Sequence, residues 1–149
     1  MKVLVQRVKQ AQCLVNSEIV GSIEQGLLLY VSFSASDTLE ILPKMAKKVT
    51  HLRIFEDEAG KMNHALIDFH YSILSISQFT LEASTKKGHR PSFTNAMNPT
   101  DANAYYDQFN QLLREYGVNV QTGAFQETMA IASVNDGPVT IMLEEGDES

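Results

Sequence analysis

The sequence is poor in cysteine and in long hydrophobic runs, and both shortages narrow the class of protein. Its single cysteine, Cys13, cannot form an internal disulfide, which indicates a reducing compartment such as the cytoplasm. No apolar run approaches the roughly 18 residues of a membrane-spanning helix. Charges at Lys2 and Arg7 come too early for a secretory signal peptide. We therefore expect a soluble, cytoplasmic protein with no membrane partner.

Positive charge is also scarce, since the formal net charge is −6. This balance argues against a general electrostatic affinity for nucleic acid. Four of the acidic residues lie in the last six positions, and we expect an acidic tail that frays from about residue 144. The basic residues gather in two places: Lys44, Lys47, Lys48 and Arg53, and then Lys86, Lys87, His89 and Arg90. Each cluster fits either a solvated face or a local contact with an RNA backbone.

The length of 149 residues fits one domain spanning 1–149, with no internal repeat or linker. Alternating apolar residues predict strands over 2–8 and 10–16, and the run 26–33 is apolar on both faces, as in a central strand. A helix is expected over 38–52, although Pro43 is tolerable only if the helix begins near Leu42.

The second half of the chain predicts further strands and one clear helix. The strands are expected at 52–55, 71–74, 118–122, 128–134 and 139–143. The helix begins after Thr100 as its N-cap and ends at Gly117. A polar loop over 82–97 is long enough to be functional or mobile. This order of elements predicts a single α/β domain with mixed sheets and two helices on one face.

The first candidate site is the segment 76–81, where a predicted strand ends in polar residues. Ser77, Gln78 and Thr80 surround one aromatic residue, Phe79. Hydroxyls, an amide and a ring at one strand end suit a small-molecule or acyl-transfer site. The alternative is a strand edge whose hydroxyls satisfy nearby backbone groups.

The second candidate is the segment 135–140, Asn-Asp-Gly-Pro-Val-Thr. Asn-Asp-Gly predicts a hairpin turn between the last two strands. Pro138 directly after Gly137 is unusual there, because proline removes a ladder donor. Only about 5–6% of X-Pro bonds are cis, so local physics favours a trans turn.

Together, the two segments resemble the D-aminoacyl-tRNA deacylase family of the bacterial type. Four shorter motifs support the resemblance: Leu-Arg-Ile-Phe-Glu-Asp at 52–57, Gly-Lys-Met-Asn at 60–63, Arg-Pro-Ser-Phe at 90–93 and Thr-Gly-Ala-Phe at 122–125. Their order extends over nearly the whole chain. One departure stands out, because Phe-Gln-Glu-Thr-Met occupies 125–129 where the family usually has Phe-Gly-Ala-Asp-Met.

The resemblance implies a homodimer with a three-layer β/β/α fold that hydrolyses the ester between a D-amino acid and tRNA, without a metal or other cofactor. It also implies that the Gly137-Pro138 bond is cis and enters the partner subunit's pocket. Main-chain carbonyls there would hold the substrate's α-ammonium and leave no room for an L side chain. Achiral glycine would be poorly excluded, so some action on glycyl-tRNA is expected.

The resemblance further assigns roles to residues of the substrate pocket that it implies. The N–H groups of Phe79 and Thr80 would stabilise the oxyanion, while Ser77 and Gln78 would shape the pocket. The free 2′-hydroxyl of the terminal ribose would help to activate water. Phe125 and Met129 would line the adenosine pocket. Phe125 either stacks on adenine or packs in the core, and Arg7 either contacts the 3′ end, braces the pocket or lies at the surface.

Four alternatives stay open at this point. Thr80 is a covalent nucleophile only if a base adjoins it, and the sequence places none of the four histidines (His51, His64, His70 and His89) there. Their spacing also shows no metal-ligand pattern. Cys13 lies in a strand-like segment, where packing is the usual role and nucleophilic chemistry the alternative.

A non-catalytic dimeric module that binds RNA ends or nucleotides is the second function considered for the whole protein. A generic esterase is the third, and it lacks a nucleophile–base set.

Overall fold

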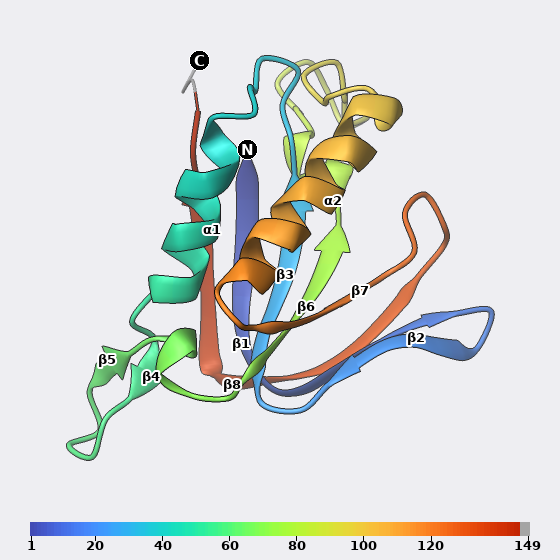
Figure 1. Cartoon of the computed structure of the whole chain (residues 1–149). Helices are drawn as coiled ribbons and strands as arrows, with labels where there is room; N and C mark the ends of the chain where they lie inside the picture. Colours follow the sequence, from blue (N-terminus) through green and yellow to red (C-terminus); the bar gives the residue numbers. More distant parts are fainter. Residues whose placement is uncertain (147–149) are drawn as a thin grey trace.

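The computed structural model describes residues 1–146, which form a mixed sheet covered on one side by two α-helices (Figure 1). The elements follow in the order β1 (Lys2–Val15), β2 (Glu18–Ile23), β3 (Gly26–Ser32), α1 (Ile41–His51), β4 (Phe55–Glu56), β5 (Met62–His64), the 3-10 helix η1 (Leu66–Asp68), β6 (Ser72–Ser77), the 3-10 helix η2 (Phe79–Glu82), α2 (Pro99–Glu115), β7 (Asn119–Thr122) and β8 (Ala130–Glu144). Among these residues no helix has the length and apolar character needed to cross a membrane.

The main sheet has the strand order β2-β1-β3-β6-β7, with β8 on the other edge of β1. β1 pairs with β3 along its first half and with β2 along its second half. The second half therefore curls over the sheet as a further layer (Figure 1). β2 approaches β7 there, since a Cβ on Gly21 would stand 2.6 Å from the carbonyl oxygen of Thr122. Glycine permits this approach, and the sheet nearly closes into a barrel.

Two apolar cores explain the three layers. Leu27 and Leu29 of β3 pack toward the helices, where they meet α1 and α2. Leu28, from the opposite face of β3, packs with Leu74 and Cys13 between the two β-layers. The expected strand with two buried faces and the three-layer β/β/α fold are thus confirmed. Cys13 is fully buried, and burial raises the pKa of its thiol, which suits packing rather than nucleophilic chemistry.

Several predicted boundaries are wrong, most importantly the hairpin at 135–138. β8 is one continuous strand that pairs with β1 on both sides of this segment. Gln6 pairs with Thr140 and Val8 pairs with Asn135, so four residues of β8 bulge opposite Arg7 alone. The chain does not reverse, because both halves of β8 share one partner strand. Likewise, the two strands expected over 2–8 and 10–16 are the single strand β1.

The helix boundaries differ by a few residues from those expected. α1 begins at Ile41 rather than at residue 38, and Pro43 lies in its first turn, where no backbone donor is required. The N-cap of α2 is Asn98, not Thr100: its side-chain oxygen accepts a hydrogen bond from the Asp101 N–H at 3.0 Å. Gly117 follows α2 with φ 82°, as expected of a C′ glycine.

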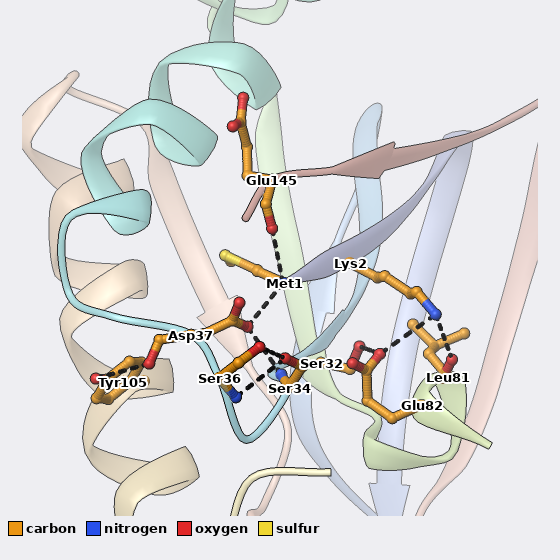
Figure 2. A network of polar contacts seen from close by, with 10 residues as sticks. All are labelled: Met1, Lys2, Ser32, Ser34, Ser36, Asp37, Leu81, Glu82, Tyr105 and Glu145. Atoms are coloured by element: carbon orange, nitrogen blue, oxygen red, sulfur yellow. Dashed lines mark hydrogen bonds and ion pairs between the residues drawn. The ribbon is translucent and has the colours of Figure 1, made fainter. Parts of the chain in front are cut away.

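The predicted fraying from residue 144 is wrong at the first two residues of the acidic segment. Glu144 still pairs with Lys2 at the end of β8. The carbonyl oxygen of Glu145 accepts from the Met1 ammonium at 2.8 Å, and its carboxylate lies 2.7 Å from Lys48. Figure 2 shows how Met1 also pairs with the buried Asp37 carboxylate, at 2.7 Å. The remaining part of the predicted tail, 147–149, lies outside the described residues.

Candidate active site

A cavity of about 630 Å³ opens at the carboxyl ends of the parallel strands β3 and β6. Ligands commonly bind at this edge of parallel strands, because the loops that leave the strands form a crevice there. Its walls come from four segments: Val31, Ser32 and Phe33; Ile76, Ser77, Gln78 and Phe79; Phe93, Ala96, Met97, Asn98, Pro99 and Ala102; and Phe125, Gln126, Glu127, Thr128, Met129 and Ile131.

The first wall is the turn from β6 into η2, which the sequence identified. Gln78 extends the β3–β6 contact, because its N–H donates to the Val31 carbonyl at 2.7 Å. The chain then turns sharply into the 3-10 helix at Phe79. Within the described residues, the N–H groups of Phe79 and Thr80 have no hydrogen-bond acceptor. Two free donors beside a cavity can bind a carbonyl oxygen or an oxyanion.

Thr80 itself is exposed and does not line the cavity. Its hydroxyl accepts a hydrogen bond from the Gln78 side-chain amide, and an amide is not a base. No histidine of residues 1–146 bonds to this hydroxyl: the imidazole of His51 contacts Thr50, and that of His64 faces Asp68 at 3.8 Å. The geometry therefore lacks the nucleophile–base contact that covalent catalysis by Thr80 would need.

The opposite wall is the segment 123–129 between β7 and β8, where Phe125 and Met129 both reach the cavity. Phe125 is half-buried and stacks on Tyr106, with ring centroids 6.3 Å apart and an interplanar angle of 27°. Tyr106 is buried, and its hydroxyl donates to the Ser75 carbonyl at 2.6 Å. Burial raises the pKa of this hydroxyl, which keeps it protonated as a donor. Tyr106 thus packs against one face of the Phe125 ring, while Phe125 also borders the cavity.

The residues that depart from the family pattern all face this cavity. Gln126 has φ 62°, the left-handed region that glycine adopts without strain. This conformation suits the glycine that the family resemblance predicts at position 126. Glu127 is the one titratable residue among the described residues that line the cavity.

The mouth of the cavity is aromatic, a feature that the sequence did not identify. Phe79 and Phe93 contact each other edge to face at 5.1 Å and are 57% and 36% exposed. Phe93 belongs to the long loop over 83–97, whose C-terminal end is fixed to the segment that follows β3. Ala35 donates to the Asn95 carbonyl at 2.8 Å, and Met97 donates to the Phe33 carbonyl at 3.1 Å. Because these contacts join distant segments, no local pattern could have found them.

The remaining predicted site residues form a second group outside the cavity. The Gly137-Pro138 bond is cis, and both residues are exposed. Arg7 is buried at 6% exposure, so a surface position is excluded. Its guanidinium donates to the Ile54 carbonyl at 2.7 Å and to the Asp136 carbonyl at 3.2 Å. Arg7 therefore braces the bulge that carries Gly137 and Pro138, and it is not a wall of the cavity.

Residues 1–146 contain no group of three His, Cys, Asp or Glu side chains arranged to hold a metal ion. The cavity instead offers backbone donors, a carboxamide, hydroxyls and aromatic rings. Such a set can position a polar ester and stabilise charge on its carbonyl oxygen.

Comparison with known proteins places this geometry in context. The family model described as D-Tyr-tRNA(Tyr) deacylase matches residues 4–144. The D-aminoacyl-tRNA deacylases of Geobacillus sp. (strain WCH70) and Bacillus pumilus (strain SAFR-032) are each 49% identical over 144 residues. These alignments cover 97% of this chain and 95% and 98% of the relatives.

Two solved structures are also similar. The c-Myc DNA Unwinding Element Binding Protein superposes with a TM-score of 0.92 at 38% identity, over 99% of this chain and 100% of that one. A probable eukaryotic D-amino acid tRNA deacylase reaches a TM-score of 0.84 at 22% identity, over 95% and 97% of the two chains. The second similarity concerns the fold alone.

Proposed function

The chain belongs to the D-Tyr-tRNA(Tyr) deacylase family, and from this premise we propose how its cavity performs the reaction of a D-aminoacyl-tRNA deacylase. The enzyme is a carboxylic ester hydrolase that releases a free D-amino acid and free tRNA. The observation that carries this activity is the 49% identity to curated deacylases over 97% of the chain.

The chemistry requires little more than positioning, because an ester between an amino acid and ribose is already activated. We assign the N–H groups of Phe79 and Thr80 to the oxyanion of the tetrahedral intermediate, since neither has an acceptor among residues 1–146. Ser77 and Gln78 shape the floor beside them. The free 2′-hydroxyl of the terminal ribose helps water to attack, so that no protein nucleophile is needed.

The terminal adenosine occupies the opposite wall, against Phe125 and Met129. An aromatic ring is the usual platform for an unpaired base. Phe125 suits this role because Tyr106 supports one side of its ring while the residue still borders the cavity. Packing and base stacking are thus compatible functions of the same side chain.

Chiral selection comes from a second subunit in this proposal. Gly137 and Pro138 are exposed and lie away from their own chain's cavity, so they are available to a partner. In a homodimer their carbonyls accept hydrogen bonds from the substrate's α-ammonium and leave no volume for an L side chain. Arg7 holds the bulge in place. β8 also exposes Val134 and Met142, apolar side chains that suit a subunit interface.

The decisive experiment compares the hydrolysis of D-Tyr-tRNA, L-Tyr-tRNA and Gly-tRNA by the purified protein. We expect rapid loss of the D ester, intermediate loss of the glycyl ester, and loss of the L ester at the spontaneous rate. Turnover of both tyrosyl esters would retain a hydrolase but contradict the exclusion of L side chains. Binding of tRNA without any turnover would favour a non-catalytic module.

A further inference from the structure

An uninterrupted basic segment lies beside the active cavity in an otherwise acidic protein. Residues 83–100 contain three lysines and arginines (Lys86, Lys87 and Arg90) and no aspartate or glutamate, while the whole chain carries a net charge of −6. No carboxylate of residues 1–146 lies within ion-pair distance of these three side chains. Their charge is therefore uncompensated, and they are all exposed.

The fold presents these charges on a closed loop. Ser84 and Ser92 exchange two backbone hydrogen bonds, each of 2.8 Å, so the residues between them project as a short hairpin. We call residues 85–91 the basic loop. Three residues after the base of this loop, the Ala35 N–H donates to the Asn95 carbonyl, which fixes the segment to the turn after β3. This attachment gives the charges a defined position relative to the cavity.

A second cavity, of about 540 Å³, lies between the basic loop and the turn after β3. Its polar lining includes Lys2 and Lys86 together with Ser34, Ser36, Ser84 and Asn95. Hydroxyls, a carboxamide and ammonium groups are the side chains that most often contact phosphate oxygens. The lining is therefore suited to an anion that carries several acceptor oxygens.

One carboxylate, that of Glu82, also borders this cavity, and it is already paired. It is 6% exposed, accepts a hydrogen bond from the Ser32 hydroxyl at 2.9 Å, and lies 3.7 Å from the Lys2 ammonium (Figure 2). Lys2 thus offsets the charge of Glu82. Within residues 1–146, Lys86 is the lysine of this cavity wall that has no ion-pair partner.

The two cavities adjoin each other. Phe93 lines the active cavity, and the next two residues, Thr94 and Asn95, line the second one. Ser32 lines the active cavity and bonds to Glu82 in the wall of the second. An RNA strand that leaves the active cavity past Phe93 can therefore continue over the second cavity.

We propose that the second cavity and the basic loop bind phosphates of the tRNA acceptor end upstream of the aminoacylated adenosine. This inference rests on the proposed function, because it takes tRNA as the substrate. Such a site would also explain how an acidic protein binds an RNA substrate. Favourable phosphate contacts are confined to this part of the surface, while the net negative charge of the protein repels unrelated nucleic acid.

The test compares Lys86→Glu with Lys61→Glu. Both residues are exposed lysines, but Lys61 lies in the β4–β5 hairpin, far from the loop (Figure 1). Each variant is assayed on D-Tyr-tRNA and on the D-tyrosyl ester of adenosine, which has no phosphate. We expect Lys86→Glu to raise KM for the tRNA about tenfold at low salt and to leave kcat unchanged. The adenosine ester should be hydrolysed as by the wild type.

Binding of uncharged tRNA provides a readout that does not depend on catalysis. The slope of log affinity against log salt should fall by roughly 0.7 to 0.9 in Lys86→Glu and stay constant in Lys61→Glu. Equal effects of both lysine variants, equal effects on both substrates, or no effect of Lys86→Glu would each overturn the phosphate site. A wild-type protein that binds tRNA but does not hydrolyse D-Tyr-tRNA would instead contradict the proposed function.

Discussion

Gln126 carries a local conformational cost at the wall of the active cavity. Its φ of 62° lies in the left-handed region of backbone conformation. A residue with a Cβ adopts this region at a cost of about 1–2 kcal/mol. Gln126→Gly should remove this cost, although the freer unfolded chain offsets about 0.4–1 kcal/mol. We expect the free energy of unfolding in urea to rise by a net of roughly 0.5–1 kcal/mol.

Glu127→Gly is the matched control for this prediction. Glu127 is the exposed neighbour of Gln126 and does not have a positive φ. A glycine at position 127 only increases the conformational entropy of the unfolded chain, so the variant should be less stable than the wild type. Equal shifts in the two variants would mean that the φ of Gln126 has no energetic consequence.

Thr80 tests whether the backbone or the side chain acts in catalysis. The proposal uses the N–H of Thr80, which Thr80→Ala retains, so kcat should stay within about tenfold of the wild type. Removal of a true nucleophile costs on the order of 10⁴-fold or more. Thr80→Val, which preserves the branched shape, separates loss of the hydroxyl from loss of packing. Inactivity of both variants with an intact circular dichroism spectrum would restore the nucleophile mechanism.

At the scale of elements, the N-terminus of α2 is where local patterns misled. Asn98 and Thr100 are both good capping residues, but only the Asn98 side chain accepts from the backbone, at Asp101. Proline at N1, here Pro99, is the pattern that indicates the correct boundary. Asn98 also lines the active cavity, so the cap helps to shape the site.

Asn98→Ala should therefore lower the free energy of unfolding by about 1 kcal/mol, because a helix donor loses its acceptor. Thr100→Ala, a change at an exposed position two residues later, should have little effect. Thermal or urea unfolding of the two variants measures the difference. A larger loss in Thr100→Ala would show that the helix begins where its sequence pattern suggested.

Elements governed by local periodicity were predictable, and elements governed by distant pairing were not. The doubly buried β3, the polar end of β6 and the termination of α2 at Gly117 all follow from spacing and residue type. The continuity of β8 does not, since Asn-Asp-Gly favours a reversal that pairing with β1 on both sides overrides. The role of Arg7 was likewise not predictable from local sequence. It depends on the register of β1 against the bulge, which brings the Arg7 guanidinium within hydrogen-bond distance of the Asp136 carbonyl.

At the scale of the whole molecule, the fold separates the parts of the proposed site. The cavity forms where β3 and β6 end, whereas the exposed Gly137-Pro138 bulge lies on β8, opposite Arg7. Within one chain the bulge does not line the cavity. In the homodimer that we propose, twofold symmetry would give each cavity the other chain's bulge, so that the two parts would meet twice.

Gly137→Ala should disable the bulge without touching the cavity of its own chain. The new Cβ would lie 2.9 Å from Val139 Cγ2 and 3.1 Å from Arg7 Nη2, at a φ of 126° that disfavours L residues. We expect kcat/KM for D-Tyr-tRNA to fall about 100-fold, since a displaced binding group misaligns the ester. Full activity would count against a role of this bulge in the site.

Mixed dimers then decide whether the bulge acts across subunits. Gly137→Ala is unfolded and refolded with an equal amount of Phe125→Ala/Met129→Ala, which lacks both side chains assigned to the adenosine. Half of the dimers are then mixed, and each contains one cavity with intact walls facing an intact bulge. Activity should recover to about a quarter of the wild-type value, although each parent alone is impaired. If cavity and bulge served the same chain, every protomer would keep its own defect, and mixing would restore nothing.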